Sequence, residues 1–213
     1  MEPAEGVVMN NMADPGPGRA ELGFKEAVLS GFNFLATYGL RPVYEEITFI
    51  RFESAVVFVN VYHGRASFEL GVEFGRLNNP DEKLSLYDVI AWAGAENAEG
   101  FGQHVVFQVS NRKGTQEFVP KLARLVQQYA VPFLRGDAGA YQAANELQSR
   151  RGDEYVKEVN LNPIRAKAEA AWRSKDYAQV AKLYSSMRQD LSSVEAARLS
   201  YAAKHAPASR SVQ

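Results

Sequence analysis

The strongest constraint on the fold is the run RASFELGVEFGRL at residues 65–77, in which apolar and polar residues alternate. A β-strand points successive side chains to opposite faces, so this alternation predicts a strand with one buried face. The apolar set is Phe68, Leu70, Val72 and Phe74. The runs EEITFIRFES and AVVFVNVYHG precede it and are separated only by short turns. Because short turns connect antiparallel neighbours, the sequence predicts a three-stranded meander over residues 45–77.

Helical patterns flank this meander. An apolar stripe at spacings of three and four residues, from Phe24 to Tyr38, predicts an N-terminal helix that ends at Gly39. A short helix over residues 86–93, capped by Ser85, is expected before a fourth strand at QHVVFQVSN, residues 103–111. The fold class is therefore α+β, with an antiparallel sheet of about four strands, an N-terminal helix and a helical C-terminal region.

The rest of the chain has helical periodicity. Thr115 is a candidate cap for a helix that would hold Pro120 in its first turn, and Asn162 with Pro163 marks a later helix start. Ser192 and Glu195 have the spacing of a capping box. The expected C-terminal helices cover about 138–149, 152–159, 162–175, 176–187 and 192–205. The run AKAEAAWRSKDYAQVAKLYSSM resembles one tetratricopeptide-type hairpin, but a single copy does not make a solenoid.

These patterns divide the chain into four parts. Residues 1–21 are rich in Pro, Gly, Asn and acidic side chains and are predicted to be a disordered leader. Residues 22–136 form the α+β domain, and residues 137–206 form a helical subdomain or extension. Residues 207–213 are predicted to be a disordered tail.

Composition excludes several classes of protein. The chain has no Cys, which removes thiol catalysis and Cys-type metal sites and fits a reducing cytoplasm. Its net charge of −1 gives no global attraction for nucleic acid. No apolar run reaches the roughly 18 residues of a membrane span, and the N-terminus lacks the features of a signal peptide. We therefore expect a cytoplasmic protein that binds neither nucleic acid nor membranes.

Motifs that carry chemistry are absent. The chain contains no G-x-S-x-G elbow, no phosphate-binding loop, no dinucleotide fingerprint and no calcium-binding loop. The histidines at 63, 104 and 205 do not have the spacing of metal ligands. The sequence thus predicts no catalytic residues, no metal and no cofactor.

The meander still gathers polar residues that suggest a site. Glu69 and Glu73 share one strand face but lie roughly 13 Å apart at about 3.3 Å per residue, too far to share a proton. Each can instead pair with a cross-strand neighbour such as Asn60 or Tyr62. His63 precedes Gly64 in an expected turn, where a histidine is usually solvated.

Three functional hypotheses follow. The first is a non-catalytic protein-binding module whose partner surface includes His63, Arg65, Glu69 and Glu73, although these acids could equally form a solubilising face. The second is a small-molecule or hydrolytic enzyme in which His63 and His104 converge with Glu69 or Glu73. The third is a helical scaffold that binds a peptide in an exposed groove beside Trp172 and Tyr184.

One resemblance bears on the first hypothesis. The order FNFLATYGLRPV, ITFIRFESAVVFVNVYHGRASFELGVEFGRL and LSLYDVIAWAG, within residues 24–95, resembles small uncharacterised bacterial proteins. Some proteins of similar layout are immunity proteins of bacterial toxin systems. The resemblance implies a cytosolic binding protein, with an immunity or anti-toxin role as its most concrete form. It contains no diagnostic motif, so it assigns no functional residue.

Overall fold

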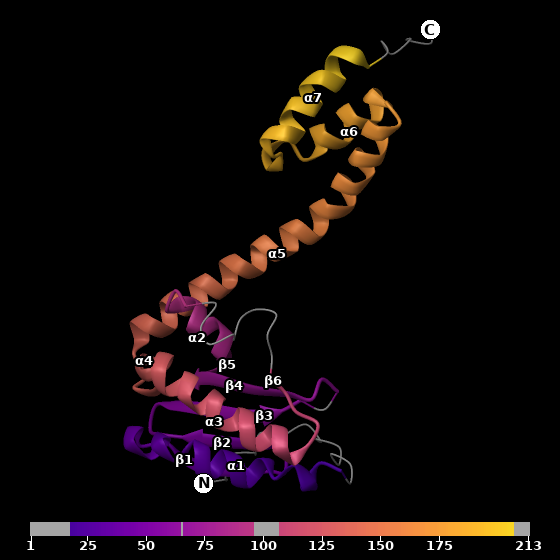
Figure 1. The fold of residues 1–213 in the computed structure, drawn as a ribbon. Helices are drawn as coiled ribbons and strands as arrows, with labels where there is room; N and C mark the ends of the chain where they lie inside the picture. Colours follow the sequence, from indigo (N-terminus) through magenta and orange to yellow (C-terminus); the bar gives the residue numbers. More distant parts are fainter. Residues whose placement is uncertain (1–17, 65, 96–106, 207–213) are drawn as a thin grey trace, which may run out of the picture. The chain divides into compact units, whose positions relative to one another are not determined.

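The computed structural model describes residues 18–64, 66–95 and 107–206 (Figure 1). The chain forms two compact units, Met1–Gln148 and Ser149–Gln213. The helix α5, Ala138–Arg173, begins in the first unit and continues into the second.

The first unit is built on an antiparallel sheet with the strand order β1-β2-β3-β4-β5 and a short β6 paired with β4. The expected meander is confirmed, but the sheet has two more strands than expected. The strands are β1 Arg41–Glu45, β2 Phe49–Glu53, β3 Val57–His63, β4 Glu69–Arg76, β5 Asn79–Ser85 and β6 Phe107–Gln108. Of the expected fourth strand, residues 103–106 lie outside the described residues.

The two additional strands, β1 and β5, are the edges of the main meander. Most of their side chains are exposed, and each strand contains a proline, Pro42 or Pro80. Their backbones pair with β2 and β4, but their side chains do not alternate between core and solvent. A period-two hydrophobic pattern therefore cannot reveal them. Proline and charge on an edge also discourage a foreign strand from adding to the sheet.

Helices cover the inner face of the sheet, which Ile50, Val61, Val72 and Phe74 form (Figure 1). Helix α1 packs against β2, whereas α3 and α4 pack against β4. The helical segments of this unit are the 3₁₀ helices η1 Ala20–Leu22 and η2 Asn33–Tyr38, and the α-helices α1 Phe24–Gly31, α2 Leu86–Trp92, α3 Arg112–Tyr129 and α4 Val131–Leu134.

The ends of these helices agree in part with the sequence. Gly39 terminates η2 with a left-handed φ of 74°, and Ser85 caps α2 in a capping box with Asp88, as expected. The predicted Thr115 cap is wrong, because the Asn111 side chain accepts from Gly114 N and α3 begins earlier. Pro120 consequently lies inside the helix. It is tolerated there because its missing bond frees a carbonyl on the exposed side of the helix.

The predicted break at Pro163 is also wrong. Three expected helices over 138–175 are the single helix α5, which contains Pro163. Proline removes the bond to the carbonyl of Val159, and Val159 is exposed, so water can satisfy that carbonyl. Because this part of the helix surface is exposed, the proline does not interrupt the helix.

The first turns of α5 belong to the sheet unit. Tyr141 is buried and donates to Gly75 O on β4 at 3.3 Å, and Gln148 Nε2 donates to Asp88 Oδ2 at 2.9 Å. The compact units accordingly divide after Gln148, whereas the sequence suggested a division after residue 136. At the other end of the unit, Arg19 is buried although it falls within the expected leader, of which residues 1–17 lie outside the described residues.

The second unit consists of the end of α5 with α6 Tyr177–Ser186, the 3₁₀ helix η4 Arg188–Asp190 and α7 Ser193–His205. Its small core is formed by Leu161, Ala168, Ala171, Val180, Tyr184, Met187 and Ala202. Ser192 and Glu195 form the predicted capping box at the start of α7. Within this unit, α6 and α7 pack as a helical pair.

On the outer face of the sheet, two aromatic rings lie across glycines of β4. Phe58 pairs with Gly75 and Tyr62 pairs with Gly71 in the β3–β4 register. A Cβ built on Gly75 would lie 2.2 Å from the Phe58 ring, and one on Gly71 would lie 2.2 Å from Tyr62. These glycines leave the space that the rings occupy, which explains how Phe58 is fully buried on the outer face.

We predict that Gly75→Ala destabilises the sheet unit by about 1–3 kcal/mol, because the added methyl overlaps a ring that cannot move freely. Gly18→Ala is the matched control, since a Cβ at Gly18 meets nothing within 4 Å. Urea denaturation followed by the amide signals of β3 and β4 measures the difference. Equal stability of the two variants would show that Phe58 is not locked against β4.

Candidate functional site

His63, the first residue of the predicted partner surface, is buried with only 3% of its surface exposed. The expectation that it is solvated in a turn is wrong, because β3 extends through His63, and Arg19 before η1 and Phe24 of α1 contact its ring. The Arg19 guanidinium lies 3.2 Å from Nδ1, and Nε2 lies 2.7 Å from Val109 O. Arginine can only donate, so Nδ1 accepts and Nε2–H donates to the carbonyl. Both ring nitrogens of a neutral imidazole are therefore occupied.

Phe68 beside it also departs from the expected pattern. The alternation placed Phe68 in the core with Leu70, but its φ is 56° and 43% of its surface is exposed. It lies in the turn before β4 begins, where its ring contacts His63 and the Arg19 guanidinium stacks 5.0 Å from the ring centroid. The buried set on β4 is thus limited to Leu70, Val72 and Phe74.

The two glutamates of the predicted surface are half-buried on β4. Glu73 accepts from Asn60 Nδ2 at 3.2 Å, so the expected cross-strand pairing is present. Glu69 is the backbone register partner of Gln108 on β6, the short strand that pairs with β4. Arg65 and His104 lie outside the described residues.

Around Glu73 the outer face carries a chain of polar contacts. Arg51 Nε donates to Glu53 Oε1 at 2.5 Å, and its guanidinium lies 3.9 Å from the Phe58 ring centroid. Lys83 Nζ lies 3.9 Å from Glu73 Oε2. Arg51, Glu73 and Lys83 border a shallow hollow of about 430 Å³. Burial raises the pKa of the Tyr62 phenol, and the charges of Glu73 and Glu69 raise it further.

Nearby cations balance the acidic residues of this region. Glu45 pairs with Lys25 at 2.8 Å, just as Glu53 pairs with Arg51 and Glu73 lies beside Lys83. The face therefore attracts a basic partner less than a count of its glutamates suggests. This pairing weakens the interpretation of the outer sheet face as an acidic docking surface.

The side chains of His63 and Glu73 do not lie close together. His63 pairs with Leu70 and Glu73 pairs with Asn60, three residues earlier on β3, so their side chains leave opposite faces of the sheet. His63 borders the outer hollow, but its ring nitrogens are held by Arg19 and Val109. Within the described residues, no group of three or more His, Asp and Glu could hold a metal ion.

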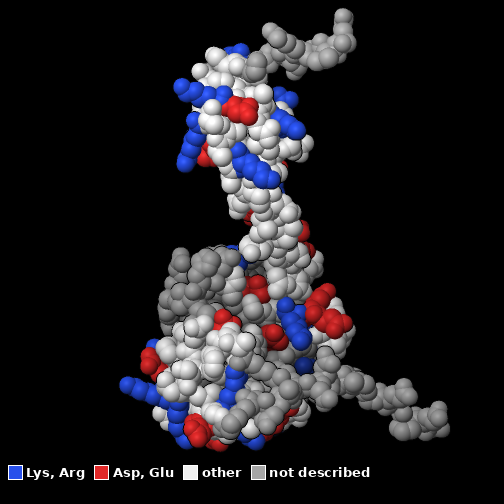
Figure 2. Space-filling model, turned by 90° about the vertical axis from the view of Figure 1, so that its right-hand side faces the viewer, with Lys and Arg blue, Asp and Glu red and all other residues white. Residues whose placement is uncertain are grey.

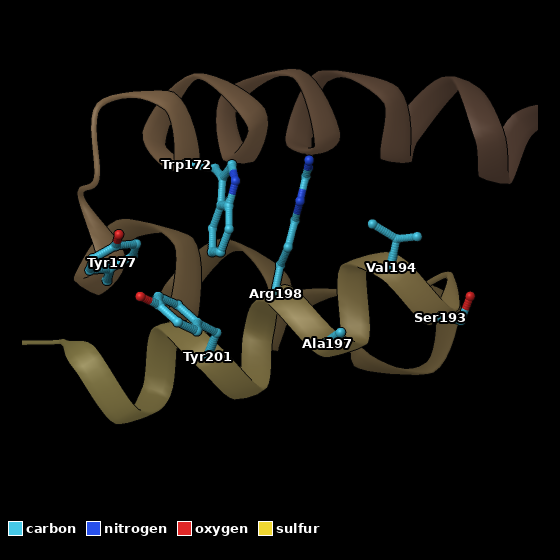
Figure 3. Close-up of a pocket in the computed structure, with 7 residues that line it drawn as sticks. All are labelled: Trp172, Tyr177, Ser193, Val194, Ala197, Arg198 and Tyr201. Carbon is cyan, nitrogen blue, oxygen red and sulfur yellow. The ribbon is translucent and has the colours of Figure 1, made fainter.

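A second candidate site lies in the C-terminal unit, between the end of α5 and α7 (Figure 3). Trp172 points from α5 toward α7, and Arg198 reaches back from α7 toward α5. A hollow of about 510 Å³ opens beside them and is mainly apolar. We call it the aromatic groove, and it is lined by Trp172, Tyr177, Ser193, Val194, Ala197, Arg198 and Tyr201.

The rings of Trp172, Tyr177 and Tyr201 form a triangle at one end of the groove. Their centroids lie 5.4–5.8 Å apart in edge-to-face pairs, a favourable arrangement of aromatic quadrupoles. Tyr201 also stacks on His205 at 3.9 Å, and this third histidine is the last residue of α7. Partial desolvation raises the pKa of Tyr177, and its Tyr201 neighbour adds to the effect.

Ion pairs fix the two walls of the aromatic groove. Glu169 on α5 pairs with Arg198 on α7, and Arg165 Nε lies 3.1 Å from Glu195 Oε1. Arg165 also donates to Asp190 O at 3.0 Å, which ties η4 to α5. The Arg198 guanidinium stacks 5.2 Å from the Trp172 centroid. These contacts hold α5 and α7 together, so the groove side chains are carried on rigid elements, which lowers the entropy cost of binding.

The sequence identified part of this groove. It pointed to Trp172, but Tyr184, the other expected residue, is buried in the small core. It missed Val194, Arg198 and Tyr201. Their spacing of three and four residues on α7 is the signal that could have found them, because such residues share one helix face.

Comparisons with protein-family models, with curated proteins and with solved structures find no match to this chain. In the part of the chain that the structure describes, no helix has the length and apolar character needed to cross a membrane. The candidate sites therefore rest on their own geometry.

The environment of His63 leads to a pH prediction. Burial lowers the pKa of His63, and the Arg19 charge lowers it further, while the bond to Val109 O acts in the opposite direction. The unfolded chain therefore binds a proton at His63 at a higher pH than the folded chain does. The contribution of His63 to the free energy of unfolding is fully present above about pH 6.5 and falls as the pH drops below that value. The slope reaches at most about 1.4 kcal/mol per pH unit.

Urea denaturation from about pH 7.5 to about pH 5.5, followed by the amide signals of β3, measures this loss. His63→Gln is the comparison, because glutamine retains a donor and an acceptor but does not titrate in this range. We expect the stability of the wild type, relative to His63→Gln, to decrease on acidification. Parallel curves for the two proteins would contradict the neutral, buried state of His63.

Proposed function

We propose that this protein is a non-catalytic, cytosolic protein-binding module that holds a segment of its partner in the aromatic groove. The observation that carries the proposal is an exposed apolar surface on a preformed helical frame. Val194 is 61% exposed and Tyr201 is 44% exposed, and both line the groove with Trp172. Exposed apolar residues that cluster around a hollow are typical of protein interaction sites.

The composition of the aromatic groove supports a protein ligand. Trp, Tyr and Arg are the side chains most enriched among residues that dominate binding energy, and Trp172, Tyr201 and Arg198 supply one of each. The groove lies between helices that ion pairs hold together, so the aromatic side chains are presented on rigid elements. This arrangement favours the peptide-binding hypothesis over a partner surface at Glu69 and Glu73.

The more specific role, an immunity or anti-toxin protein of a bacterial toxin system, stays a prediction. It rests on the resemblance of residues 24–95, which lie in the sheet unit, whereas the aromatic groove lies in the C-terminal unit. The enzyme hypothesis has less support, because the hydrogen bonds of His63 leave neither ring nitrogen available for proton transfer.

We predict that Val194→Asp weakens partner binding about tenfold or more, because it places a carboxylate in the apolar part of the groove. Val194 is the second residue of α7, where an acidic side chain suits the helix dipole, so the fold should be retained. Val156→Asp is the matched control: Val156 is 57% exposed on α5 but does not line the groove.

The test uses affinity capture from a cytosolic extract with the wild type and both variants, followed by titration of each purified partner. The proposal requires a partner that binds the wild type and Val156→Asp equally but binds Val194→Asp at least about tenfold more weakly. A partner that binds all three proteins with equal affinity would remove the aromatic groove from the function. Circular dichroism of the variants checks that the helices are intact.

A further inference from the structure

The aromatic groove has a chemical preference that goes beyond protein binding in general. We propose that it takes an acidic peptide segment that carries one large apolar side chain. The inference rests on the proposed function and specifies the partner of the same site. The shape of the hollow, the charge of the unit and the lysines near the aromatic triangle support it.

The shape of the aromatic groove favours a bulky apolar side chain in the ligand. The hollow of about 510 Å³ is lined by three rings, by Val194 and by the small side chains of Ala197 and Ser193. Figure 3 shows Arg198 between Trp172 and Val194, and the small side chains of Ala197 and Ser193 leave room for a large side chain on the α7 wall. Burying a large apolar side chain there contributes about 1.5–3 kcal/mol before the costs of association.

The charge of the C-terminal unit favours acidic residues on either side of that apolar side chain in the peptide. Residues 149–213 contain 12 Lys and Arg against 7 Asp and Glu, a net charge of +5. Residues 1–148 contain 12 Lys and Arg against 18 Asp and Glu, a net charge of −6. Basic side chains gather over the C-terminal unit in the upper part of Figure 2. The whole chain is nearly neutral, but the unit that contains the groove is basic.

Two lysines lie close in sequence to the aromatic residues of the groove. Lys175 lies in the turn between Trp172 and Tyr177, where its amide donates to Trp172 O at 3.1 Å. Lys204 follows Tyr201 by one helical turn on α7 and is exposed. Among the described residues, neither lysine forms an ion pair within 4.0 Å. Within the described residues, both lysines are thus unpaired charges that lie close in sequence to the aromatic triangle.

The acids near the groove, in contrast, are already engaged. Glu169 pairs with Arg198 and with Arg173, and Glu195 pairs with Arg165. Asp176 caps α6 by accepting from Gln179 N at 3.0 Å. These acids offer little to a basic ligand, whereas the lysines attract an acidic one.

Two other ligand chemistries fit less well. A quaternary or methylated ammonium needs an open aromatic cage, but these three rings pack against one another and Arg198 covers the Trp172 face. A nucleic acid would stack its bases on open aromatic faces, but these rings pack edge to face against one another and Arg198 covers Trp172. The acidic, apolar peptide is the ligand that satisfies both the rings and the lysines.

Three synthetic peptides test the proposal. Each has one central Trp flanked by Glu, by Gln or by Lys, and the perturbation of the Trp172 indole N–H signal reports binding to the full chain. At about 0.01 M salt, where the Debye length is about 30 Å, we expect the Glu peptide to bind at least tenfold more tightly than the Gln peptide. The preference should shrink strongly at about 1 M salt, where the Debye length is about 3 Å.

Variants separate the two parts of the ligand. Lys175→Gln with Lys204→Gln should bring the affinity for the Glu peptide down toward that of the Gln peptide. Val194→Asn, which changes no charge, should weaken binding of the Glu peptide and of the Gln peptide by a similar factor of about tenfold or more, and Val156→Asn should not. A single-stranded DNA oligonucleotide is titrated in parallel, as the probe for a nucleic-acid ligand.

The outcomes distinguish this inference from the proposed function. Equal affinity for the Glu and Gln peptides would overturn the acidic preference while leaving a peptide-binding groove. Binding of neither peptide would also overturn it, and the extract experiment with Val194→Asp would then decide the proposed function separately. Tighter binding of the oligonucleotide than of the Glu peptide, lost in Val194→Asp, would assign the groove to nucleic acid instead.

Discussion

The pairing of β3 with β4 is the interaction on which the rest of the sheet unit depends. Its inner face buries Val61, Val72 and Phe74 against the helices, and its outer face holds Phe58 over Gly75. Both faces of the central strands are therefore packed, although one of them is the solvent side of the sheet. The start of α5 is tied to the same pair, because Tyr141 bonds to Gly75 O. A small change at this glycine should reach both the sheet and the first turns of the long helix.

The C-terminal unit is held together differently from the sheet unit. Its core is small, so few buried residues hold three helical segments together, and ion pairs between α5 and α7 add geometric definition. Exposed ion pairs contribute little stability by themselves, but here they hold the two walls of the aromatic groove in register. The outer sheet face has the opposite character, since its charged groups contact one another and leave little net charge for a partner.

Much of the fold could be predicted because hydrophobic periodicity reports directly on burial. The β4 alternation, the Gly39 end of η2 and both capping boxes were identified from local patterns. The strands β1 and β5 were not, because their backbones pair while their side chains face solvent. The prolines in α3 and α5 misled the assignment of helix boundaries, since each lies where an exposed carbonyl can be satisfied by water. Of the aromatic groove, only Trp172 was found in advance, because the other wall comes from a helix more than twenty residues away.

The sequence by itself determined the α+β class, the antiparallel meander and the helical character of the C-terminal region, because these follow from interactions between near neighbours in the chain. Only the tertiary structure decided that His63 is buried and paired, that α5 is one helix, and that Trp172, Tyr177 and Tyr201 meet at one groove. The physical reason is distance along the chain. Arg19 and Val109 reach His63 from 44 and 46 residues away, and no local pattern encodes such contacts.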